Sequence, residues 1–382
     1  LLLDLAKWLE YNKTLEIKQK EAELKAKSLL KTKKSQLTLI DLDIDLNSPK
    51  QVLETLQSLG INITSTNEKI LAPLAPQYPA ISALLEYRHY NKLLSAFGKP
   101  LPQKINPVTG RIHATFWQVN TRAGRYSNSD PNLQQLPRIF EVRSCFIPAP
   151  GYKFVIADYS QIELRIAAEL AQETKMIQAY KDGLDLHKLT ASFVLEKPLE
   201  AVTKQDRQTA KASNFGLLYG QGAEGFKNYA EGSYGVKLSL ASATKIRERF
   251  FKAYPGLVTW HQKIKTEMYR SFRISKLAEV RTLSGRRRLF TEPKFTEFVN
   301  TPDQGTGADI LKLALGNLIK KLEGTKIKLV HVVHDEIILE APEEKAEEAG
   351  KILREVMEEA GAEFIKSVPI ISSSSFGNSW AD

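Results

Sequence analysis

The hydrophobic and polar positions in the first quarter of the chain predict helices. Residues 4–34 show a helical pattern with Lys and Glu over most of its surface and positive charge at its end, where the helix dipole favours cations. Ser48 before Pro49 is typical of a helix N-terminus, and the helix that follows should end near Gly60. A third helix is predicted over residues 78–97. This quarter is basic and carries no catalytic pattern.

The rest of the chain mixes strands and helices. Turn residues recur over 106–160, and within this stretch residues 152–157 form an apolar run that predicts a buried strand. Residues 161–275 show mainly helical patterns. Residues 326–340 predict two strands on either side of a polar turn, and 343–360 predict an acidic amphipathic helix with a solvated outer face.

Composition favours a nucleic-acid partner without proving one. The 382 residues include 54 Lys and Arg against 44 Asp and Glu, a formal net charge of +10. Such an excess suits a polyanion, although a protein can be basic for other reasons. The length predicts two or three subdomains. Asp41, Asp43 and Asp45 alternate as on one face of a strand, and we interpret them as surface charge.

The cysteine count and the hydropathy exclude several classes of protein. Cys145 is the only cysteine, which excludes an internal disulfide and a zinc site built on several cysteines, and which favours a reducing, intracellular setting. No stretch approaches the ~20 apolar residues of a membrane helix. The first residues lack the basic segment of a signal peptide, and the missing initiator Met indicates a fragment of a longer protein.

Two groups of carboxylates occur beside predicted strands. Asp158 follows a buried strand and precedes a helix, a position suited to binding a hard cation, although such a carboxylate can also be a helix cap. Asp335 and Glu336 lie in a turn between two apolar strands. Burying acids there costs free energy unless a cation or hydrogen bonds compensate, and the alternative is an ordinary polar turn.

A third pattern places four side chains on one face of a helix. Arg207, Lys211, Phe215 and Tyr219 follow one another at four-residue spacing. Each step turns the helix by only ~40° past a full turn, so two cations and then two aromatic rings share a face. Cations can bind a triphosphate, and rings can pack on a sugar and a base. Core helices also show this spacing, but their buried stripes rarely begin with Arg and Lys.

Together these patterns resemble motifs A, B and C of family A DNA polymerases. The resemblance extends from about Asn47 to Trp380. Other matching segments are Gly124-Arg125, Asp130-Pro131-Asn132-Leu133-Gln134, Asp185-Leu186-His187, Tyr254-Pro255-Gly256, Gly285-Arg286-Arg287 and Gln304-Gly305-Thr306-Gly307-Ala308-Asp309. The resemblance implies an α+β fold shaped like a right hand, with an antiparallel β palm, helical fingers and a helical thumb. The implied domains are a palm-packing helix over 1–34, a thumb over 35–105, palm over 106–165, fingers over 166–290 and palm over 291–382.

The resemblance also implies roles for individual residues at the reaction centre. Asp158 and Asp335, with the Tyr159 carbonyl, would hold two Mg²⁺ ions, with Mn²⁺ as an alternative, and Glu336 would tune the site from close by. Lys211 would contact the triphosphate and act as general acid to the pyrophosphate. The other residues implied to bind the nucleotide are Arg207 and His187 at the β- and γ-phosphates, Gln161, Phe215 at the sugar, and Tyr219 near the templating base.

Two further roles follow from the resemblance. Glu163 stands where the family blocks a ribose 2′-hydroxyl, which favours DNA synthesis over RNA synthesis. Primer–template DNA would be contacted by Arg125, Arg143, Asn300, Gln304 and His334. The run Ser372-Ser373-Ser374-Ser375 departs from the family's alternating strand and should weaken strand formation there.

The function that the resemblance implies is that of a DNA-directed DNA polymerase. It would extend a primer with dNTPs in replication or repair, as a monomer in the cytoplasm of a bacterium or of a phage-infected cell, with no membrane association. Neither a proofreading nor a 5′-nuclease domain has a counterpart in the chain. Reverse transcription is an open side activity. The alternatives are a single-subunit RNA polymerase, against which Glu163 argues, and an inactive nucleic-acid-binding module, against which the retained Asp158, Asp335, Lys211 and Arg207 argue.

Overall fold

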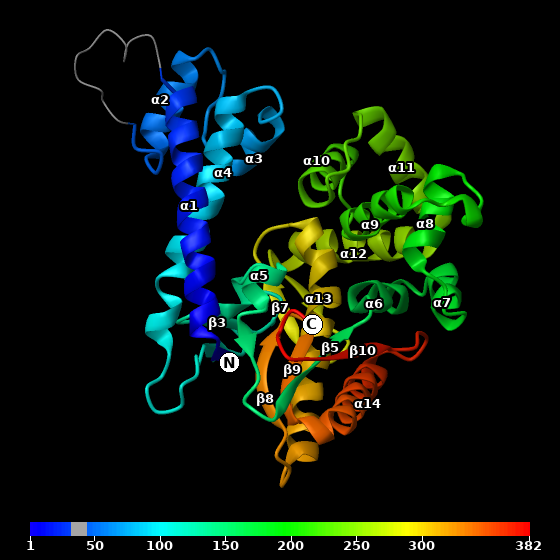
Figure 1. The fold of residues 1–382 in the computed structure, drawn as a ribbon. Coiled ribbons are helices and arrows are strands. Elements are labelled where there is room, and N and C mark those ends of the chain that lie inside the picture. Colours follow the sequence, from blue (N-terminus) through cyan, green and yellow to red (C-terminus); the bar gives the residue numbers. More distant parts are fainter. Residues whose placement is uncertain (32–43) are drawn as a thin grey trace, which may run out of the picture. The chain divides into compact units, whose positions relative to one another are not determined.

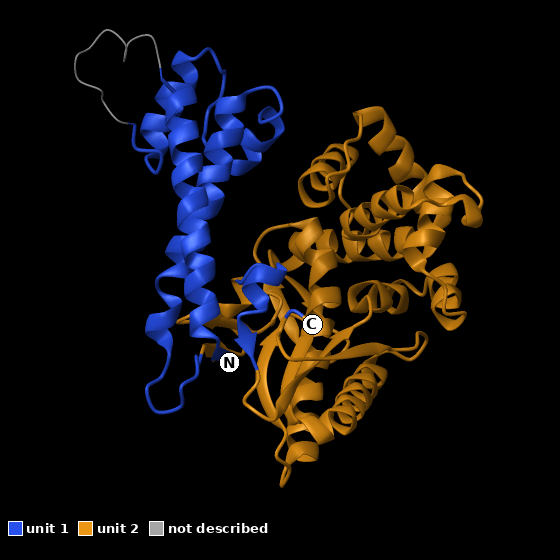
Figure 2. Cartoon of the chain, viewed as in Figure 1, with its two compact units in different colours: residues 1–113, 136–147, 381 blue, residues 114–135, 148–380, 382 orange. Residues whose placement is uncertain are grey.

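The computed structural model of the chain describes residues 1–31 and 44–382. Asp41 and Asp43 of the predicted acidic stretch lie outside these residues. The chain divides into two compact units (Figure 2). The first unit comprises residues 1–113 and 136–147, and the second comprises 114–135 and 148–380.

The first unit is built around two long helices. Its helices are α1 (Leu5–Leu29), α2 (Pro49–Ser58), α3 (Glu68–Leu71), α4 (Pro79–Leu93) and α5 (Phe140–Arg143). Its strands β1 (Leu2–Leu3) and β4 (Phe146–Ile147) pair antiparallel. Trp8 and Asn12 of α1 both donate to the Gly98 carbonyl, at 3.0 Å and 2.8 Å, just after the α4 region. These two bonds join the N-terminal helix to the chain about ninety positions later.

The helices predicted for this unit are confirmed with small differences in their bounds. α1 begins as expected, after the Asp4 side chain accepts from the Lys7 amide, and ends at Leu29. Ser48 caps α2, and Gly60 follows it with a φ of +82°. The third predicted helix corresponds to α4 followed by a π-helical turn over Leu94–Gly98.

The second unit contains a four-stranded antiparallel sheet, shown in Figure 1. Its strands, in spatial order, are β10 (Ser372–Gly377), β5 (Tyr152–Tyr159), β9 (Glu336–Pro342) and β8 (Lys328–Val333). The predicted strand over 152–157 and the two predicted strands over 326–340 are therefore confirmed. β9 is buried along its whole length, as suits a central apolar strand.

The serine run forms the edge strand of this sheet. Ser372–Gly377 pairs with Phe154–Tyr159 without a break, so the low β-propensity of serine does not prevent the strand. The Ser372 amide donates to Glu358 of helix α14 (Ala346–Phe364), at 2.9 Å. The backbone pairing with β5 and the contact with α14 compensate for the low β-propensity of the serine residues.

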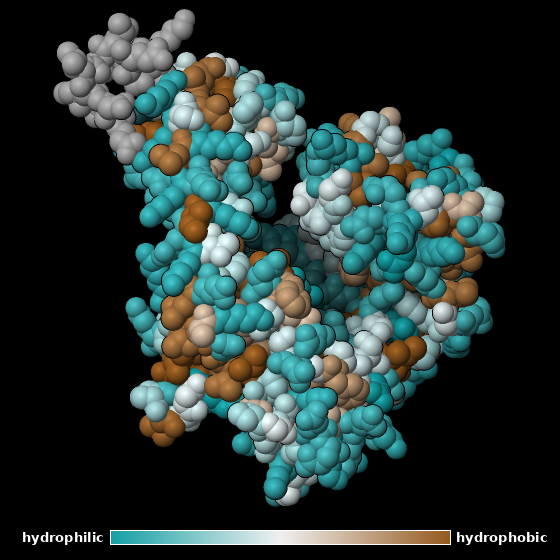
Figure 3. Space-filling model, in the orientation of Figure 1, coloured by the Kyte–Doolittle hydropathy of each residue, from teal (hydrophilic) through white to brown (hydrophobic). Residues whose placement is uncertain are grey.

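Helix α14 packs on the sheet through its apolar face. The Tyr159 hydroxyl, buried beneath it, donates to the Met357 carbonyl at 2.8 Å. The outer face carries exposed charges, and Figure 3 shows hydrophilic residues gathered over this helix. The predicted acidic amphipathic helix is thus confirmed.

The remaining helices of the second unit share one apolar core with the sheet. They are α6 (Ile162–Ala171), α7 (Thr174–Lys181), α8 (Leu186–Leu195), α9 (Lys204–Leu218), α10 (Ala223–Tyr234), α11 (Leu240–Ala253), α12 (Pro255–Ser275) and α13 (Phe295–Leu322). Two hairpins complete the unit: β2 (Thr115–Trp117) with β3 (Ser127–Ser129), and β6 (Ala278–Arg281) with β7 (Arg287–Phe290). No helix of the described ranges combines the length and the hydropathy that crossing a membrane requires.

Two helix glycines provide a matched test of packing. A Cβ at Gly361 of α14 would lie 2.6 Å from Ile370 Cγ2, whereas a Cβ at Gly316 of α13 would meet no atom within 4 Å. We expect Gly361→Ala to lower the free energy of unfolding by about 1–3 kcal/mol through overpacking. Gly316→Ala should raise it by about 0.5–1 kcal/mol, because alanine is the better helix former. Urea denaturation of both variants measures this, and wild-type stability in Gly361→Ala would contradict the close packing.

Candidate active site

The sheet brings the predicted carboxylates together at one end of its two central strands. In the β5–β9 register Asp158 lies directly opposite Glu336, and Asp335 is one residue earlier, in the two-residue turn between β8 and β9. Asp158 and Asp335 are half-buried, and Glu336 is buried. Residues far apart in the sequence thus meet because two apolar strands pair in one register.

The backbone turns sharply beside both aspartates. Gln161, which precedes α6, and His334, which precedes Asp335, each have a φ of +57°. For residues with a Cβ this left-handed conformation costs roughly 1–2 kcal/mol. It allows the chain to leave each strand next to its carboxylate, and strain of this kind concentrates at functional sites.

Glu336 has a hydrogen-bond donor that the sequence did not reveal. Trp380 Nε1 donates to Glu336 Oε1 at 2.9 Å, and the Trp380 ring packs edge-on against His331, with centroids 5.3 Å apart. We expected acids in this apolar hairpin to need a cation or hydrogen bonds, and for Glu336 a hydrogen bond is present. No local signal could have identified Trp380, because it lies 44 positions further along the chain.

The donor set at the strand ends fits a hard divalent cation. Burial and then the Asp335 carboxylate raise the pKa of Tyr159, which places Asp335 near that residue. The described residues contain no group of three His, Cys, Asp or Glu side chains placed to hold a metal. Mg²⁺ commonly uses one or two carboxylates and completes its shell with water and substrate phosphates. Asp158, Asp335 and the Tyr159 carbonyl supply oxygen donors of that kind.

Helix α9 presents the predicted face of cations and an aromatic ring. A capping box between Thr203 and Asp206 begins the helix, which carries Arg207, Lys211 and Phe215. Tyr219 follows directly, as the C-cap residue. The predicted helix is therefore confirmed.

Arg207 is held at the start of the neighbouring helix α8. Its Nε donates to Asp185 Oδ2 at 2.7 Å, while Asp185 Oδ1 accepts from the His187 amide at 2.9 Å. Burial raises the pKa of Asp185, but the hydrogen bonds from Arg207 and the backbone outweigh it and lower the pKa. Asp185 therefore stays ionised and aligns α8 with the cationic end of α9.

His187 is buried within a chain of hydrogen bonds. The Tyr254 hydroxyl lies 2.6 Å from Thr190 Oγ1, which donates to Asn214 Oδ1 at 3.0 Å. Asn214 Nδ2 lies 2.8 Å from His187 Nδ1 and so donates to it, leaving the ring proton on Nε2. The ring also packs against Phe215, with centroids 5.9 Å apart. The structure thus brings His187 beside Phe215, with its side chain only 3% exposed.

A polar group at the start of α6 joins three of the predicted residues, which are Glu163, Tyr219 and Arg125. The Tyr219 hydroxyl donates to Glu163 Oε2 at 2.7 Å, and Arg125 donates to Glu163 Oε1. Gln161, just before the helix, accepts from the Tyr180 hydroxyl at 3.0 Å. The end of α9 is therefore joined to the segment that follows Asp158.

The residues predicted to contact DNA are divided between the two units. Arg125, Asn300 and Gln304 of the second unit are half-buried, and His334 of that unit is exposed. Arg143 lies in α5 of the first unit, so the structure does not place it relative to the others.

The loop that carries Arg125 is held by Arg286. This guanidinium donates to the Ala123 carbonyl at 2.8 Å and to Asp309 Oδ1 of α13 at 2.7 Å. The sequence marked Arg286 only as part of a matching segment, and its positioning role follows from the structure.

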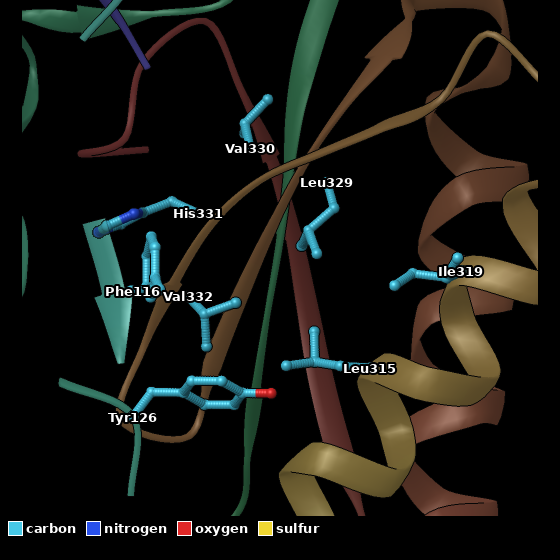
Figure 4. A pocket seen from close by; sticks show the side chains of 8 residues that line it. All are labelled: Phe116, Tyr126, Leu315, Ile319, Leu329, Val330, His331 and Val332. Carbon is cyan, nitrogen blue, oxygen red and sulfur yellow. The ribbon is translucent and has the colours of Figure 1, made fainter. Parts of the chain in front are cut away.

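The second unit also has an apolar hollow of about 260 Å³. Figure 4 shows Phe116 and Tyr126 on one side of it, with β8 and two α13 side chains completing the lining. None of the predicted catalytic or nucleotide-binding residues lines it. We therefore assign the candidate site to the strand ends and not to this hollow.

The buried His187 should make stability depend on pH. Burial and then the Arg207 charge lower the pKa of His187 to about 4, from 6.5. Between pH 4 and pH 6.5 the folded chain therefore binds fewer protons than the unfolded chain. The contribution of His187 to the free energy of unfolding is complete above pH 6.5 and is lost as the pH falls toward 4. Wild type should lose on the order of 3 kcal/mol more than His187→Gln over this range. Chemical denaturation at a series of pH values measures the difference, and equal losses would show that His187 titrates normally.

The Trp380 hydrogen bond should stabilise the second unit. Trp380→Phe keeps an aromatic ring but removes the donor to buried Glu336, which should cost about 1–3 kcal/mol. Trp117→Phe is the matched control, because Trp117 Nε1 donates to Ser129 Oγ on an exposed hairpin, and its loss should stay within about 0.5 kcal/mol. Thermal melts give the change in melting temperature for both variants. Equal changes would show that the Trp380 hydrogen bond stabilises the fold no more than the exposed Trp117 hydrogen bond does.

Comparison with known proteins shows the family of the chain. The model of DNA polymerase family A matches residues 13–382. DNA polymerase I of Aquifex aeolicus is 39% identical over 380 residues, which cover 96% of this chain and 63% of that protein. The thermostable DNA polymerase I of Thermus aquaticus is 36% identical over 330 residues, which cover 83% of this chain and 38% of that protein.

A solved structure is similar over the full chain. The polymerase domain of Pol1 from M. smegmatis, in complex with a DNA primer-template and dNTP, matches with a TM-score of 0.86 at 27% identity. The match covers 100% of this chain and 67% of that chain, and it supports the expected α+β polymerase fold. The chain spans less than two thirds of the length of these curated relatives. It belongs to DNA polymerase family A.

Proposed function

We propose that the chain is a DNA-directed DNA polymerase that extends a primer 3′ end with dNTPs. The observation that carries this proposal is the link from Tyr219 to Glu163, at 2.7 Å. It joins the end of the cationic helix α9 to the segment that directly follows Asp158. A triphosphate held on α9 would then have its sugar near Glu163 and its α-phosphate near the two aspartates. The complex that the M. smegmatis domain forms with primer-template and dNTP supports the same substrates.

The carboxylate end of the sheet would hold the divalent ions. Asp158, Asp335 and the Tyr159 carbonyl would bind two Mg²⁺, with Mn²⁺ as an alternative. When bound, such ions supply Lewis-acid stabilisation of the charge on the attacking and leaving oxygens. Glu336, held by Trp380, would tune the site from close by without being a ligand.

The α9 face would bind and orient the triphosphate. Arg207 and Lys211 would contact its phosphate oxygens, and Lys211 would donate a proton to the departing pyrophosphate. His187, neutral and with its ring proton on Nε2, would donate a hydrogen bond from Nε2 to a phosphate that contacts the buried ring. Phe215 would pack against the sugar, and Gln161 would help to hold the nucleotide.

Sugar selection would depend on Glu163. Its carboxylate accepts from both Arg125 and Tyr219, so its place is set from two sides. A side chain held in this way would exclude a ribose 2′-hydroxyl by occupying the space that the hydroxyl needs.

The polymerase domains map onto the elements as follows. We assign the four-stranded sheet with α13 and α14 to the palm, the helical region over 166–290 to the fingers, and the described helices α2, α3 and α4 within 35–105 to the thumb, with α1 as the N-terminal helix that precedes them. Arg125, Arg143, Asn300, Gln304 and His334 would contact the primer–template duplex. The chain would act as a monomer in the cytoplasm.

Removing one carboxylate at the strand ends tests this proposal. In Mg²⁺ and dNTPs, Asp335→Asn should extend a recessed primer about 1000-fold more slowly than wild type, because it loses an anionic ligand. Duplex binding, measured by fluorescence anisotropy, should remain. Asp182→Asn is the matched control, since Asp182 is an exposed carboxylate at the end of α7.

Three outcomes would contradict parts of the proposal. Undiminished extension by Asp335→Asn would remove Asp335 from the reaction centre. Extension by wild type with NTPs at rates comparable to dNTPs would contradict the role of Glu163 and favour an RNA polymerase. Tight DNA binding without extension under any divalent metal would favour a binding module.

A further inference from the structure

Asp303 is a buried acid that no part of the proposed mechanism uses. It lies in α13 directly after Pro302, and its side chain is 0% exposed. Among the described residues, neither of its carboxylate oxygens has a hydrogen-bond partner. A buried polar group in this state costs free energy, and such groups in folded proteins call for an explanation.

The charged neighbours of Asp303 are the residues of the Glu163 group. Burial and then the Glu163 carboxylate raise the pKa of Asp303 well above its usual range, while Arg125 and the Tyr219 hydroxyl lower it to a smaller extent. The Tyr219 hydroxyl has a single proton, which it donates to Glu163, so its closeness to Asp303 does not give Asp303 a hydrogen bond of normal geometry. Asp303 in turn helps to raise the pKa of Tyr219 and that of Tyr180, in each case after the effect of burial. The Asp303 carboxyl group is therefore coupled electrostatically to the group in which Glu163 accepts from Tyr219 and Arg125.

This arrangement favours one charged and one neutral carboxyl. Glu163 is paired with Arg125 and accepts from Tyr219, so both of its carboxylate oxygens have partners. One guanidinium lies beside a half-buried and a fully buried carboxyl group, and a neighbouring like charge favours the neutral form of the more deeply buried one. Asp303, which has no cation bonded to it in the described residues, is the one that stays neutral.

Stability does not explain an acid at this position. An apolar side chain of similar size would avoid the cost of burying a carboxyl without partners. Features that lower stability persist where they serve a site, and Asp303 lies beside the pair that would select the sugar.

We propose that Asp303 is a positioning residue for Glu163 and Tyr219. Its polar carboxyl group is a second polar neighbour of the Tyr219 hydroxyl, beside Glu163. Through these two residues it sets how strictly the site excludes a ribose 2′-hydroxyl. This inference rests on the proposed polymerase function. Asp303 acts through Tyr219 and Glu163, and it touches neither the nucleotide nor a metal ion in the proposed mechanism.

The test compares a polar and an apolar replacement of similar size. The quantity measured is the ratio of kcat/KM for dNTP to kcat/KM for the matching rNTP in single-nucleotide primer extension. Asp303→Leu should lower this ratio about tenfold, mainly by raising kcat/KM for the rNTP, while its melting temperature rises. Asp303→Asn, which mimics the neutral carboxyl, should stay within about twofold of wild type.

Two controls separate positioning from general loosening of α13. Thr306→Val removes a buried hydroxyl on the same helix that accepts from the Leu283 amide, so it should lower stability without changing the ratio. In a Tyr219→Phe background, Asp303→Leu should change the ratio by less than about twofold, because the hydroxyl through which Asp303 acts is gone.

The outcomes distinguish this inference from the proposed function. If Asp303→Leu keeps the wild-type ratio while Glu163→Ala loses it, the positioning role of Asp303 is overturned and the polymerase function stands. If the dNTP to rNTP ratio of kcat/KM falls as far in Asp303→Asn as in Asp303→Leu, the polarity of this side chain does not control sugar selection and the proposal also fails. If wild type does not extend with dNTPs, the proposed function itself fails. Asp303→Ala replaces Asp303→Leu, with the same expectations, if the larger side chain does not fold.

Discussion

The pairing of β5 with β9 is the constraint on which the candidate site depends. These strands lie at the centre of the sheet, and their register sets Asp158 opposite Glu336 with Asp335 in the adjoining turn. A slip of one residue would turn every side chain of a strand to the other face, and would separate Asp158 from its position opposite Glu336. The same burial that stabilises the sheet therefore also fixes the geometry of the carboxylates.

A short polar link extends this order from the sheet to the helices. α6 begins three residues after β5 ends, so Glu163 cannot move far from Asp158. Tyr219, at the end of α9, is bonded to Glu163, and Arg207, near its start, is bonded to Asp185 at the beginning of α8. The α9 face is thus held at both ends by single polar contacts. Polar contacts of this kind can change partners at a low cost in free energy, whereas a close-packed apolar core does not rearrange easily.

Local patterns predicted the elements, the carboxylates at the strand ends and the helix that carries Arg207 and Lys211, whereas long-range contacts account for features that these patterns missed. Strand periodicity and the four-residue spacing on α9 depend only on neighbouring residues, which is why the strands and this helix could be read from the sequence. Trp380 and Asp303 carry no local mark of their role. Trp380 is one aromatic residue near the C-terminus, and Asp303 follows a proline in a helix whose pattern looks ordinary. Their importance arises from residues more than forty positions away, which meet them only in the fold.

Several departures from ideal structure lie beside the carboxylates, although left-handed residues also occur elsewhere in the described chain. Gln161 and His334 have left-handed backbones, and Asp303 is an acid buried beside another acid. The scaffold nearby is, in contrast, satisfied, with the Tyr159 hydroxyl bonded beneath α14 and Glu336 bonded to Trp380. Each departure costs on the order of 1–3 kcal/mol, a small amount beside the burial of a core shared by a whole sheet and its helices. A large apolar core can therefore tolerate strain and uncompensated polarity at one end of a sheet, which is the end where Asp158, Asp335 and Glu336 meet.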